Sequence, residues 1–432
     1  MQENIKKFSF EIQKRDAGFK LMRAGKIITP HGEILTPCFV PVGTKATVKA
    51  LQVEDLQKIK AQSVLANTYH LYLQPGKDVV ERAGGFAKFM NWNLGGKTGP
   101  TWTDSGGFQV LSLGAAYGSG VTKIATDRSI AEAKHTGVGA PPSLKGKGTL
   151  GAKQRAGVGR TQMAHIDEDG VTFKSFIDGS KHRFTPEISM QIQHSLGADI
   201  FFTFDECTSP LATREYQISA MERTHRWAIR CINEHRKLGI SVATGEQQAL
   251  FAVVQGGGYA DLRKQSAEFL GAMDFDGYGI GGSFTKADIE RDVKSATQVL
   301  PENKPRHLLG IGEPIDFFTG VECGIDTFDC VIPTRVGRHG QIFTEYGKVN
   351  ITKSQYKTDF SKITEDINSP LFAYTHAYIA HLFRADEILG AMLVSQHNLY
   401  FLISIVEKIR QSILDENYLD FKKVFLGKFY KN

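Results

Sequence analysis

With 432 residues, of which 41% are hydrophobic and 23% are charged, the chain can bury a large core as one big domain or two. No apolar run approaches the roughly 20 residues that a membrane helix needs, and residues 1–16 lack the apolar stretch of a signal peptide. The five cysteines, an odd number with no C-x-x-C spacing, are expected to be reduced thiols, so the sequence predicts a cytoplasmic protein.

Short β-rich apolar runs alternate with longer helical segments through most of the chain. Strands are predicted at 38–42, 63–67, 100–104, 199–205, 249–255, 277–282, 306–312 and 327–333. Helices are predicted at 54–62, 188–197, 217–239, 259–273, 286–300 and 315–324. Eight strands that alternate with helices indicate a (β/α)₈ TIM barrel of the α/β class. An open doubly wound sheet is the alternative, but no G-x-G-x-x-G motif follows the first strand.

The positive charge is concentrated in one glycine-rich stretch, residues 114–165. This stretch has eight basic and two acidic side chains, so its net charge of +6 equals that of the whole chain, and it contains ten glycines. It shows little hydrophobic periodicity. We interpret it either as a flexible surface excursion or as a basic arm that binds nucleic acid.

Two further segments flank the predicted barrel strands. Residues 166–186 have the pattern of a hairpin inserted after the third strand. Residues 388–414 have the pattern of a long amphipathic helix or a pair of helices. We therefore divide the chain into a barrel domain at 1–345, which carries the 114–165 insertion, and an appended helical subdomain at 346–432.

Polar residues and glycines recur where the predicted strands end. They are Asp104 (third strand), Asp205 (fourth), Gln255 (fifth), Gly281 and Gly282 (sixth) and, within the eighth, Asp329. The carboxyl ends of barrel strands line the active site, so these residues are expected to meet. A single strand-end Asp often caps a helix or a turn, but recurrence on several strands disfavours that explanation for all of them.

Two short segments carry the strongest chemical signal. TDSGGFQ at 103–109 and FDCVIPTRVGRHGQ at 328–341 each combine one Asp with glycines, which let a ligand approach the backbone closely. Two carboxylates that face each other across a pocket suit nucleophilic and acid/base work on a glycosidic bond. Arg335 and Arg338 follow in the second segment, and arginine suits phosphate. The combination predicts an enzyme that cuts a base–sugar bond in a nucleic acid.

Longer motifs resemble those of the bacterial tRNA-guanine transglycosylases, the queuine tRNA-ribosyltransferase family, in the family's order. They are NTYHLYLQPG (67–76), DSGGFQVLSLG (104–114), GVTFKSFIDGSKHRFTPE (170–187), FDECTSP (204–210), VVQGG (253–257), FDGYGIGG (275–282), GIDTFDCVIPTRVGRHGQ (324–341) and HLFRADEILG (381–390). The resemblance covers nearly all of the chain apart from 114–165 and the extreme C-terminus. It implies an enzyme that exchanges guanine at the tRNA wobble position for a 7-deazaguanine, such as 7-aminomethyl-7-deazaguanine or queuine, in queuosine modification.

The resemblance also implies roles for single residues. Asp329 matches the nucleophile that attacks the ribose C1′ and forms a covalent RNA intermediate, and Asp104 matches the general acid/base. The residues that match those around the substrate base are Phe108, Asp205, Cys207, Gln255, Gly281, Gly282 and Leu309. Arg335 and Arg338 match contacts to the phosphates of the anticodon loop.

The chain departs from the family at its zinc site. Family members carry three cysteines as C-x-C-x-x-C and a His about 26 residues later, whereas the matching residues here are Asp366, Asn368, Leu371 and His397. One Asp and one His cannot form the closed tetrahedral site that structural zinc prefers. We therefore expect no metal and no cofactor, with the C-terminal subdomain retained.

Two other departures concern the substrates. The family continues its Gly-Gly with Leu-Ala-Val-Gly-Glu, whereas Gly282 is followed here by SFTKA at 283–287. By resemblance this segment borders the 7-substituent of the base. Either the incoming base differs, or a shifted loop supplies the same contacts from Asp288 or Glu290. In addition, Glu313 stands where a phosphate-contacting Lys is common.

The expected partners are tRNA, a 7-deazaguanine base and a second copy of the chain. Tyr374, Tyr378 and His381 match the family's dimer contact, although the same residues would also suit the core of the subdomain. One competing function is that of a paralogue acting on DNA or on another tRNA position. Another is a non-catalytic partner subunit, which would have lost catalytic residues, whereas Asp104 and Asp329 are both present.

Overall fold

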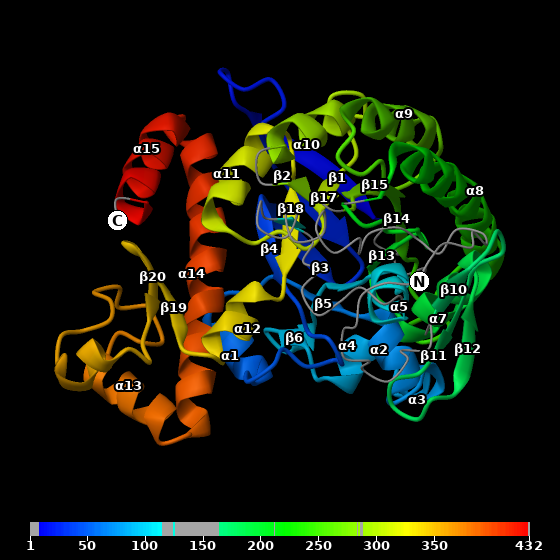
Figure 1. Cartoon of the computed structure of the whole chain (residues 1–432). Coiled ribbons are helices and arrows are strands. Elements are labelled where there is room, and N and C mark those ends of the chain that lie inside the picture. The colour runs from blue at the N-terminus through cyan, green and yellow to red at the C-terminus, as the bar shows by residue number, and fades with distance from the viewer. Residues whose placement is uncertain are drawn as a thin grey trace, which may run out of the picture.

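Eight parallel strands close into a barrel (Figure 1). The computed structural model describes residues 8–114, 124–125, 164–210, 212–282, 284–285 and 288–430. In hydrogen-bonded order the barrel strands are β4 (Cys38–Pro41), β18 (Thr327–Cys330), β17 (Arg306–Leu308), β15 (Gly277–Ile280), β14 (Ala249–Val254), β13 (Ile200–Phe202), β8 (Thr101–Thr103) and β5 (Val64–Ala66). The amide of Gly43, just after β4, donates to the carbonyl of Leu65 in β5 at 2.7 Å and closes the ring. The predicted TIM barrel is confirmed, with each strand where the sequence places it.

The six predicted helices are present, and they surround the barrel (Figure 1). They are α1 (Val53–Lys58), α7 (Pro186–Leu196), α8 (Arg214–Leu238), α9 (Ala260–Gly271), α10 (Ile289–Thr297) and α11 (Pro314–Glu322). A threonine begins each of the two helices that flank β13: the hydroxyls of Thr185 and Thr213 accept backbone N–H bonds at 3.2 and 3.3 Å. Gly197 ends α7 with a φ of 69°, a left-handed conformation that glycine adopts without strain.

Short helices that the periodicity does not predict connect the strands near the candidate site. They are α2 (Thr68–Leu73), α3 (Lys77–Arg82) and α4 (Phe86–Phe89) between β5 and β8, α5 (Gly107–Gly114) after β8, and α12 (Ile332–Gly337) after β18. Helices of four to eight residues have about one to two turns. They are too short for a hydrophobic stripe to repeat along the sequence.

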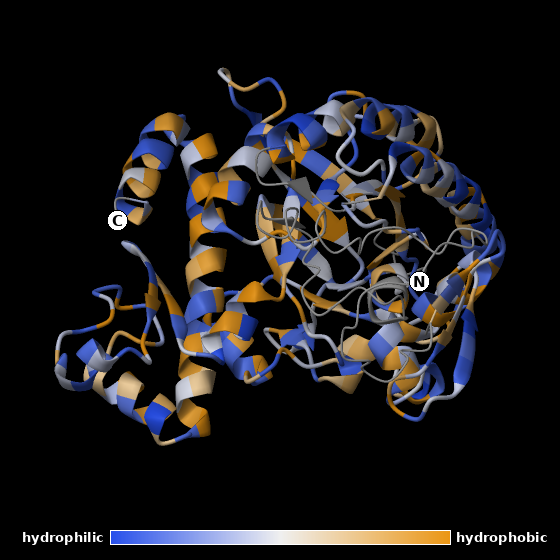
Figure 2. Cartoon of the chain, in the orientation of Figure 1, coloured by the Kyte–Doolittle hydropathy of each residue, from blue (hydrophilic) through white to orange (hydrophobic). Residues whose placement is uncertain are grey.

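An antiparallel sheet covers the amino ends of the barrel strands. It consists of β1 (Ser9–Arg15), β2 (Arg23–Thr29) and β3 (Gly32–Thr36), and its side chains Ile27 and Ile34 join the apolar cluster inside the barrel. His31 contacts Asp199, which directly precedes β13, at 2.7 Å. Figure 2 shows hydrophobic residues gathered on the central strands. With one end of the barrel sealed in this way, the carboxyl ends of the strands are left for the site.

The predicted hairpin at 166–186 has a third strand. The sheet consists of β10 (Ala164–Ile166), β11 (Val171–Lys174) and β12 (Lys181–Phe184). Another small pair, β6 (Asn93–Leu94) and β7 (Lys97–Thr98), precedes β8. Within the 114–165 insertion the backbone of β9 (Ile124–Ala125) pairs in parallel with β16 (Phe284–Thr285). Residues 115–123 and 126–163 of the insertion lie outside the described residues. All of its acidic and basic side chains belong to these two ranges, so both interpretations of its charge also lie outside the described residues.

The C-terminal part contains one long helix rather than two. It consists of β19 (Gln341–Thr344), β20 (Gly347–Asn350), a 3₁₀ helix (Ser354–Thr358), α13 (His376–Arg384), α14 (Ile388–Leu414) and α15 (Tyr418–Phe429). Figure 1 shows α14 running beside the barrel, with α13 and α15 at its two ends. The boundary at residue 345 stays a prediction, because α14 contributes Leu402, Val406 and Ile409 to the same apolar core as the barrel helices.

The sequence predicts no segment long and apolar enough to cross a membrane, but helix α14 is such a segment by length and composition. Its most apolar window has a mean hydropathy of 1.4, which meets that criterion by length and composition alone. However, 50% of that window is buried inside the protein. Burial against the barrel thus accounts for about half of this apolar window.

Candidate active site

The structure brings the predicted site residues together on one rim of the barrel, because parallel strands all end on the same side. The residues on this rim are Asp104 after β8, Asp205 after β13, Gln255 after β14, Gly281 and Gly282 after β15, Leu309 after β17, and Asp329 within β18. Two of them, Asp104 and Asp329, are close enough for the charge on Asp329 to affect the pKa of Asp104.

Asp104 is held by three donors. The Asn67 amide donates to Oδ2 at 2.5 Å, the Gln109 amide donates to Oδ2 at 2.7 Å, and the backbone N–H of Thr68 donates to Oδ1 at 2.8 Å. Burial raises the pKa of the Asp104 carboxyl above its usual range, although these hydrogen bonds oppose the shift, and the charge on Asp329 adds to it. Asp104 is therefore fixed in orientation and retains its proton to higher pH than an exposed Asp.

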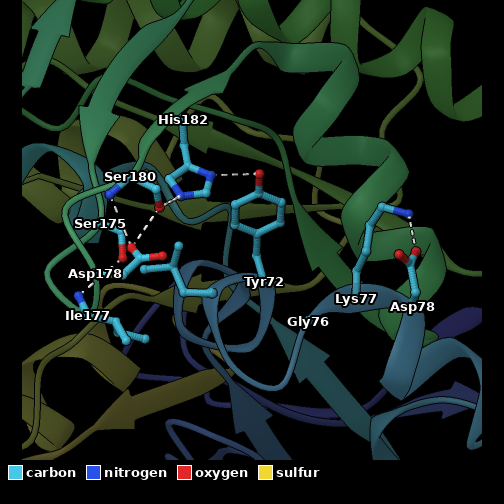
Figure 3. Close-up of a pocket in the computed structure, with 10 residues that line it drawn as sticks. Tyr72, Gly76, Lys77, Asp78, Ser175, Ile177, Asp178, Ser180 and His182 are labelled. Atoms are coloured by element: carbon cyan, nitrogen blue, oxygen red, sulfur yellow. Dashed lines mark hydrogen bonds and ion pairs between the residues drawn. The ribbon is translucent and has the colours of Figure 1, made fainter.

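The helix that presents Asn67 and Thr68 to Asp104 is itself held by the β10–β12 sheet. The Tyr72 hydroxyl of α2 contacts His182 Nδ1 at 3.0 Å, and His182 Nε2 contacts Ser180 Oγ at 2.7 Å (Figure 3). These side chains line a pocket of about 250 Å³ together with Leu73, Gly76, Lys77, Asp78, Ser175, Ile177 and Asp178. None of the rim residues lines this pocket.

Asp329 is 9% exposed, and two donors contact the same carboxylate oxygen. The backbone N–H of Gly310 donates to Oδ1 at 2.8 Å, and His307 Nε2 lies 3.0 Å from Oδ1. Sequence reasoning missed His307, because a His in the middle of a buried strand also fits an ordinary core position.

Asp205 and Gln255 form one hydrogen-bonded unit. The Gln255 amide donates to Asp205 Oδ2 at 2.6 Å, and the Ser105 hydroxyl donates to Asp205 Oδ1 at 2.8 Å. Gln255 Oε1 is buried and has no hydrogen-bond partner among the described residues. The backbone at Gly107 lies close to the backbone at Asp205, since a Cβ on Gly107 would lie 2.5 Å from the Asp205 carbonyl oxygen. Buried acceptors of this kind suit recognition of a polar ligand edge.

The glycine pair after β15 is positioned by a buried arginine. Arg263 donates from Nε to the Gly257 carbonyl at 2.6 Å and from Nη1 to the Gly281 carbonyl at 3.0 Å. Burial lowers the pKa of Arg263 to about 10. Gly282 has a φ of 89°, and a Cβ there would lie 2.9 Å from Gln255 Oε1, so both conformation and space require glycine.

The remaining predicted base contacts lie beside these groups in the chain. Phe108 is half-buried at the start of α5, Cys207 is buried two residues after Asp205, and Leu309 follows β17 and packs on the apolar cluster inside the barrel. Of the segment that replaces the family's Leu-Ala-Val-Gly-Glu, only the backbone of 284–285 is described, so the interpretation of its side chains lies outside the described residues.

Two arginines follow β18 close to the rim, one on α12 and one directly after it. Arg335 is exposed, and Arg338 follows the end of the helix with Nη1 buried and without a hydrogen-bond partner among the described residues. Desolvation lowers the pKa of Arg338, and the neighbouring charge on Arg335 adds to the shift. A bound anion would relieve both effects. Glu313, which stands where the family often has a Lys, forms an ion pair with Lys348, whose Nζ lies 2.6 Å from both carboxylate oxygens.

The positions that match the family's zinc ligands do not fit a metal. His397 is fully engaged: Nδ1 lies 2.8 Å from the Ser369 hydroxyl, and Nε2 lies 2.7 Å from the Phe343 carbonyl. Burial lowers the pKa of His397 to about 4. In residues 8–110, 164–282 and 288–430, apart from position 211, no group of three or more His, Cys, Asp or Glu side chains has the arrangement of a metal site.

Other contacts occupy the space where cysteine ligands would lie. Leu371 is 0% exposed and belongs to an apolar cluster with Ile342, Ile379 and Val394. Asp366 accepts a hydrogen bond from the Tyr400 hydroxyl at 2.6 Å. The subdomain thus has an apolar core and internal hydrogen bonds at the position of the family's metal.

Comparison with known proteins gives matches over almost the whole chain. A family model described as queuine tRNA-ribosyltransferase matches residues 18–136 and 150–431. The chain is 42% identical over 427 residues to the queuine tRNA-ribosyltransferase of Caldanaerobacter subterraneus subsp. tengcongensis, with 98% of each chain covered. It is 43% identical to that of Herpetosiphon aurantiacus (94% and 90% covered) and 42% identical to that of Streptococcus mutans (94% and 93% covered), each over 411 residues.

Proposed function

The chain belongs to the queuine tRNA-ribosyltransferase family, and we propose that this pentosyltransferase exchanges the wobble guanine of GUN-anticodon tRNAs for a 7-deazaguanine. The observation that carries the proposal is the pair of carboxylates on one rim, Asp104 and Asp329, each held in place by hydrogen bonds. Two fixed carboxylates allow displacement at a sugar carbon with one acting as nucleophile and the other moving a proton.

In the first half of the reaction, guanine leaves. A carboxylate oxygen of Asp329 bonds to C1′ of the wobble ribose while the bond from C1′ to N9 of guanine breaks. The electron pair of that bond goes to the base, and Asp104 transfers its proton to the departing guanine. The raised pKa of Asp104 favours the protonated form that this step needs.

In the second half, the incoming base takes guanine's place. Asp104, now a carboxylate, removes the proton from N9 of the 7-deazaguanine, and N9 bonds to C1′. The bond from C1′ to Asp329 breaks, and its electron pair returns to the carboxylate. Both aspartates regain their starting protonation states, so the exchange is balanced without a cofactor.

Recognition of the base rests on the buried polar unit behind the carboxylates. A base must leave its stack to be reached, and the half-buried Phe108 ring is suited to stacking on it. Asp205 and Gln255 meet the polar edge of the base, and the backbone at Gly282 donates to its carbonyl. A base with the wrong donors would leave these buried groups unpaired, which discriminates by roughly thousands-fold. Arg335 and Arg338 then contact the anticodon-loop phosphates.

A guanine-exchange assay tests the function. The protein is incubated with an unmodified GUN-anticodon tRNA and labelled guanine, and incorporation of label at the wobble position is the expected result. Absence of exchange would favour a non-catalytic partner subunit. Exchange that persists when the wobble guanine is replaced by another base, or exchange into DNA, would favour the paralogue.

The identity of the incoming base is open between two candidates. The segment after Gly282 differs from the family pattern, which favours a changed wall beside the 7-substituent and acceptance of a larger base such as queuine. A shifted loop that uses Asp288 or Glu290 would instead retain 7-aminomethyl-7-deazaguanine. Displacement of labelled guanine from tRNA by each base separates the two, since efficient displacement by the aminomethyl base and none by queuine excludes the altered pocket.

We also propose that the C-terminal subdomain folds without zinc. Metal analysis should find far less than one zinc per chain, and a chelator should leave the melting temperature unchanged. Leu371→Ala should lower the free energy of unfolding by about 2–5 kcal/mol, because it removes a fully buried apolar side chain from that core. Leu389→Ala, at a 39% exposed position, is the control and should cost much less. Stoichiometric zinc would contradict the proposal.

A homodimer through α13 is the second structural proposal. Tyr378 is 41% exposed, so it does not fill the subdomain core, and its ring stacks on that of Tyr374 at 5.6 Å. Exposed stacked aromatic rings often anchor interfaces. Light scattering at micromolar concentration should give a dimer for the wild type and a monomer for Tyr378→Ala, whereas Leu419→Ala, at an exposed position on α15, should remain a dimer. A monomeric wild type would refute the proposal.

A further inference from the structure

His307 is a fully buried histidine beside the strand that carries Asp329. It lies in the middle of β17, and its Cα partner on β18 is Thr327. Alternate residues of a strand point to the same face, so Thr327 and Asp329 both project toward His307. The imidazole contacts the rings of Trp102 and Phe202 inside the barrel, and their centroids are 5.1 and 5.3 Å away.

Both ring nitrogens of His307 have a partner on β18. Nδ1 lies 2.8 Å from the Thr327 hydroxyl, and Nε2 lies 3.0 Å from Asp329 Oδ1. A neutral imidazole has one N–H donor and one acceptor nitrogen. A carboxylate can only accept, so Nε2 carries the proton and donates to Asp329, while the Thr327 hydroxyl donates to Nδ1. The ring is thereby fixed in position, in rotation and in tautomer.

We propose that His307 is a positioning residue that orients the Asp329 carboxylate for attack on the ribose, with Thr327 selecting the tautomer that makes this possible. The inference rests on the proposed base exchange and deepens it. Together with the Gly310 N–H, the imidazole fixes one oxygen of the carboxylate and so restricts rotation of the group about its terminal bond. A nucleophile that must approach one carbon in one direction gains rate from such restriction.

The alternative is that His307 only fills the barrel interior. His225 on α8 shows such a packing role outside the barrel: its Nε2 contacts the Ser266 hydroxyl of α9 at 3.0 Å, and its ring stacks on Phe269 of α9 at 4.3 Å. His307 differs because one of its two hydrogen bonds ends on the proposed nucleophile. A structural role predicts loss of stability on substitution, whereas a positioning role predicts loss of turnover.

The test compares four variants in the guanine-exchange assay and in trapping of the denaturation-resistant RNA adduct. His307→Phe keeps a flat ring but loses both hydrogen bonds, and it should lower kcat and the rate of adduct formation by about 10- to 100-fold with KM little changed. His307→Gln, which retains an N–H donor, should recover part of the loss. Thr327→Val removes only the hydroxyl that selects the tautomer and should lower kcat by about 3- to 10-fold. His225→Phe is the control and should leave kcat unchanged.

A double-mutant cycle separates positioning from packing. If Thr327 acts through His307, Thr327→Val should lower kcat in the wild type but not in a His307→Phe background. Equal effects in both backgrounds, or a kcat within twofold of wild type in His307→Phe, would overturn the proposal. If His307→Phe does not fold, the kcat of Thr327→Val decides alone, and an unchanged value overturns the proposal. A wild-type protein without exchange would instead refute the proposed function.

Discussion

Asp329→Ala is expected to abolish the covalent RNA adduct and to lower guanine exchange by a factor on the order of 10⁴ or more. The reason is that no other group contacts the ribose carbon in the proposed reaction, so the displacement loses its nucleophile. The measurement is a denaturing gel of protein mixed with tRNA, combined with the labelled-guanine assay. Asp329→Asn is the sharper variant, since it keeps the shape of the side chain and the N–H bond from Gly310 to Oδ1.

A half-buried Asp at the other end of the barrel is the control for this loss. Asp276 precedes β15, accepts the backbone N–H of Leu250 at 2.9 Å, and has its pKa raised by burial. Asp276→Asn should retain adduct formation even if it lowers stability. An adduct that survives in Asp329→Ala and resists denaturation would show that another residue is the nucleophile.

The barrel was predictable from the sequence because each strand is a short apolar run between helical segments. The run at 249–255, for example, is fully buried on both faces and reads as a continuous hydrophobic strand. The N-terminal sheet was not predicted, since none of the seven residues of β1 is fully buried and β1 therefore lacks the continuous apolar run that marks the barrel strands. Its role in covering the barrel depends on Ile27 and Ile34 reaching a core that the rest of the chain builds.

Part of the site was also predictable. Asp104, Asp205 and Gln255 follow strands, and the barrel geometry alone brings such residues onto one rim. Asn67, which holds Asp104 at 2.5 Å, follows the second strand in the same way and could have been included on that signal. His307 could not, because only the pairing of β17 with β18 places it against Asp329.

The positions that match the family's zinc ligands show a different limit of prediction from sequence. The sequence shows that three cysteines are missing, but it does not show what His397 does without them. The structure gives both of its nitrogens neutral partners, Ser369 and the Phe343 carbonyl, and burial keeps the ring uncharged at neutral pH. A histidine in this state is a core residue, which agrees with the proposal that the subdomain is held by packing.

Asp104→Asn is expected to lower exchange by roughly 10²- to 10⁴-fold, the range of general acid–base catalysis. The substitution keeps the size of the side chain but removes the proton that departing guanine needs. Single-turnover formation of the RNA adduct, rather than the complete exchange, isolates this step. An exchange rate equal to wild type would show that guanine leaves without help from Asp104.

The pH dependence of adduct formation gives Asp104 a second, independent signature. Because burial raises its pKa, Asp104 is protonated over a wider range than an ordinary Asp, and the rate should fall as pH rises through that raised pKa. The residual rate in Asp104→Asn should lack this fall, since an amide does not titrate. A falling limb that is identical in the variant would assign the titration to another group, whereas its disappearance would identify Asp104 as the acid that releases guanine.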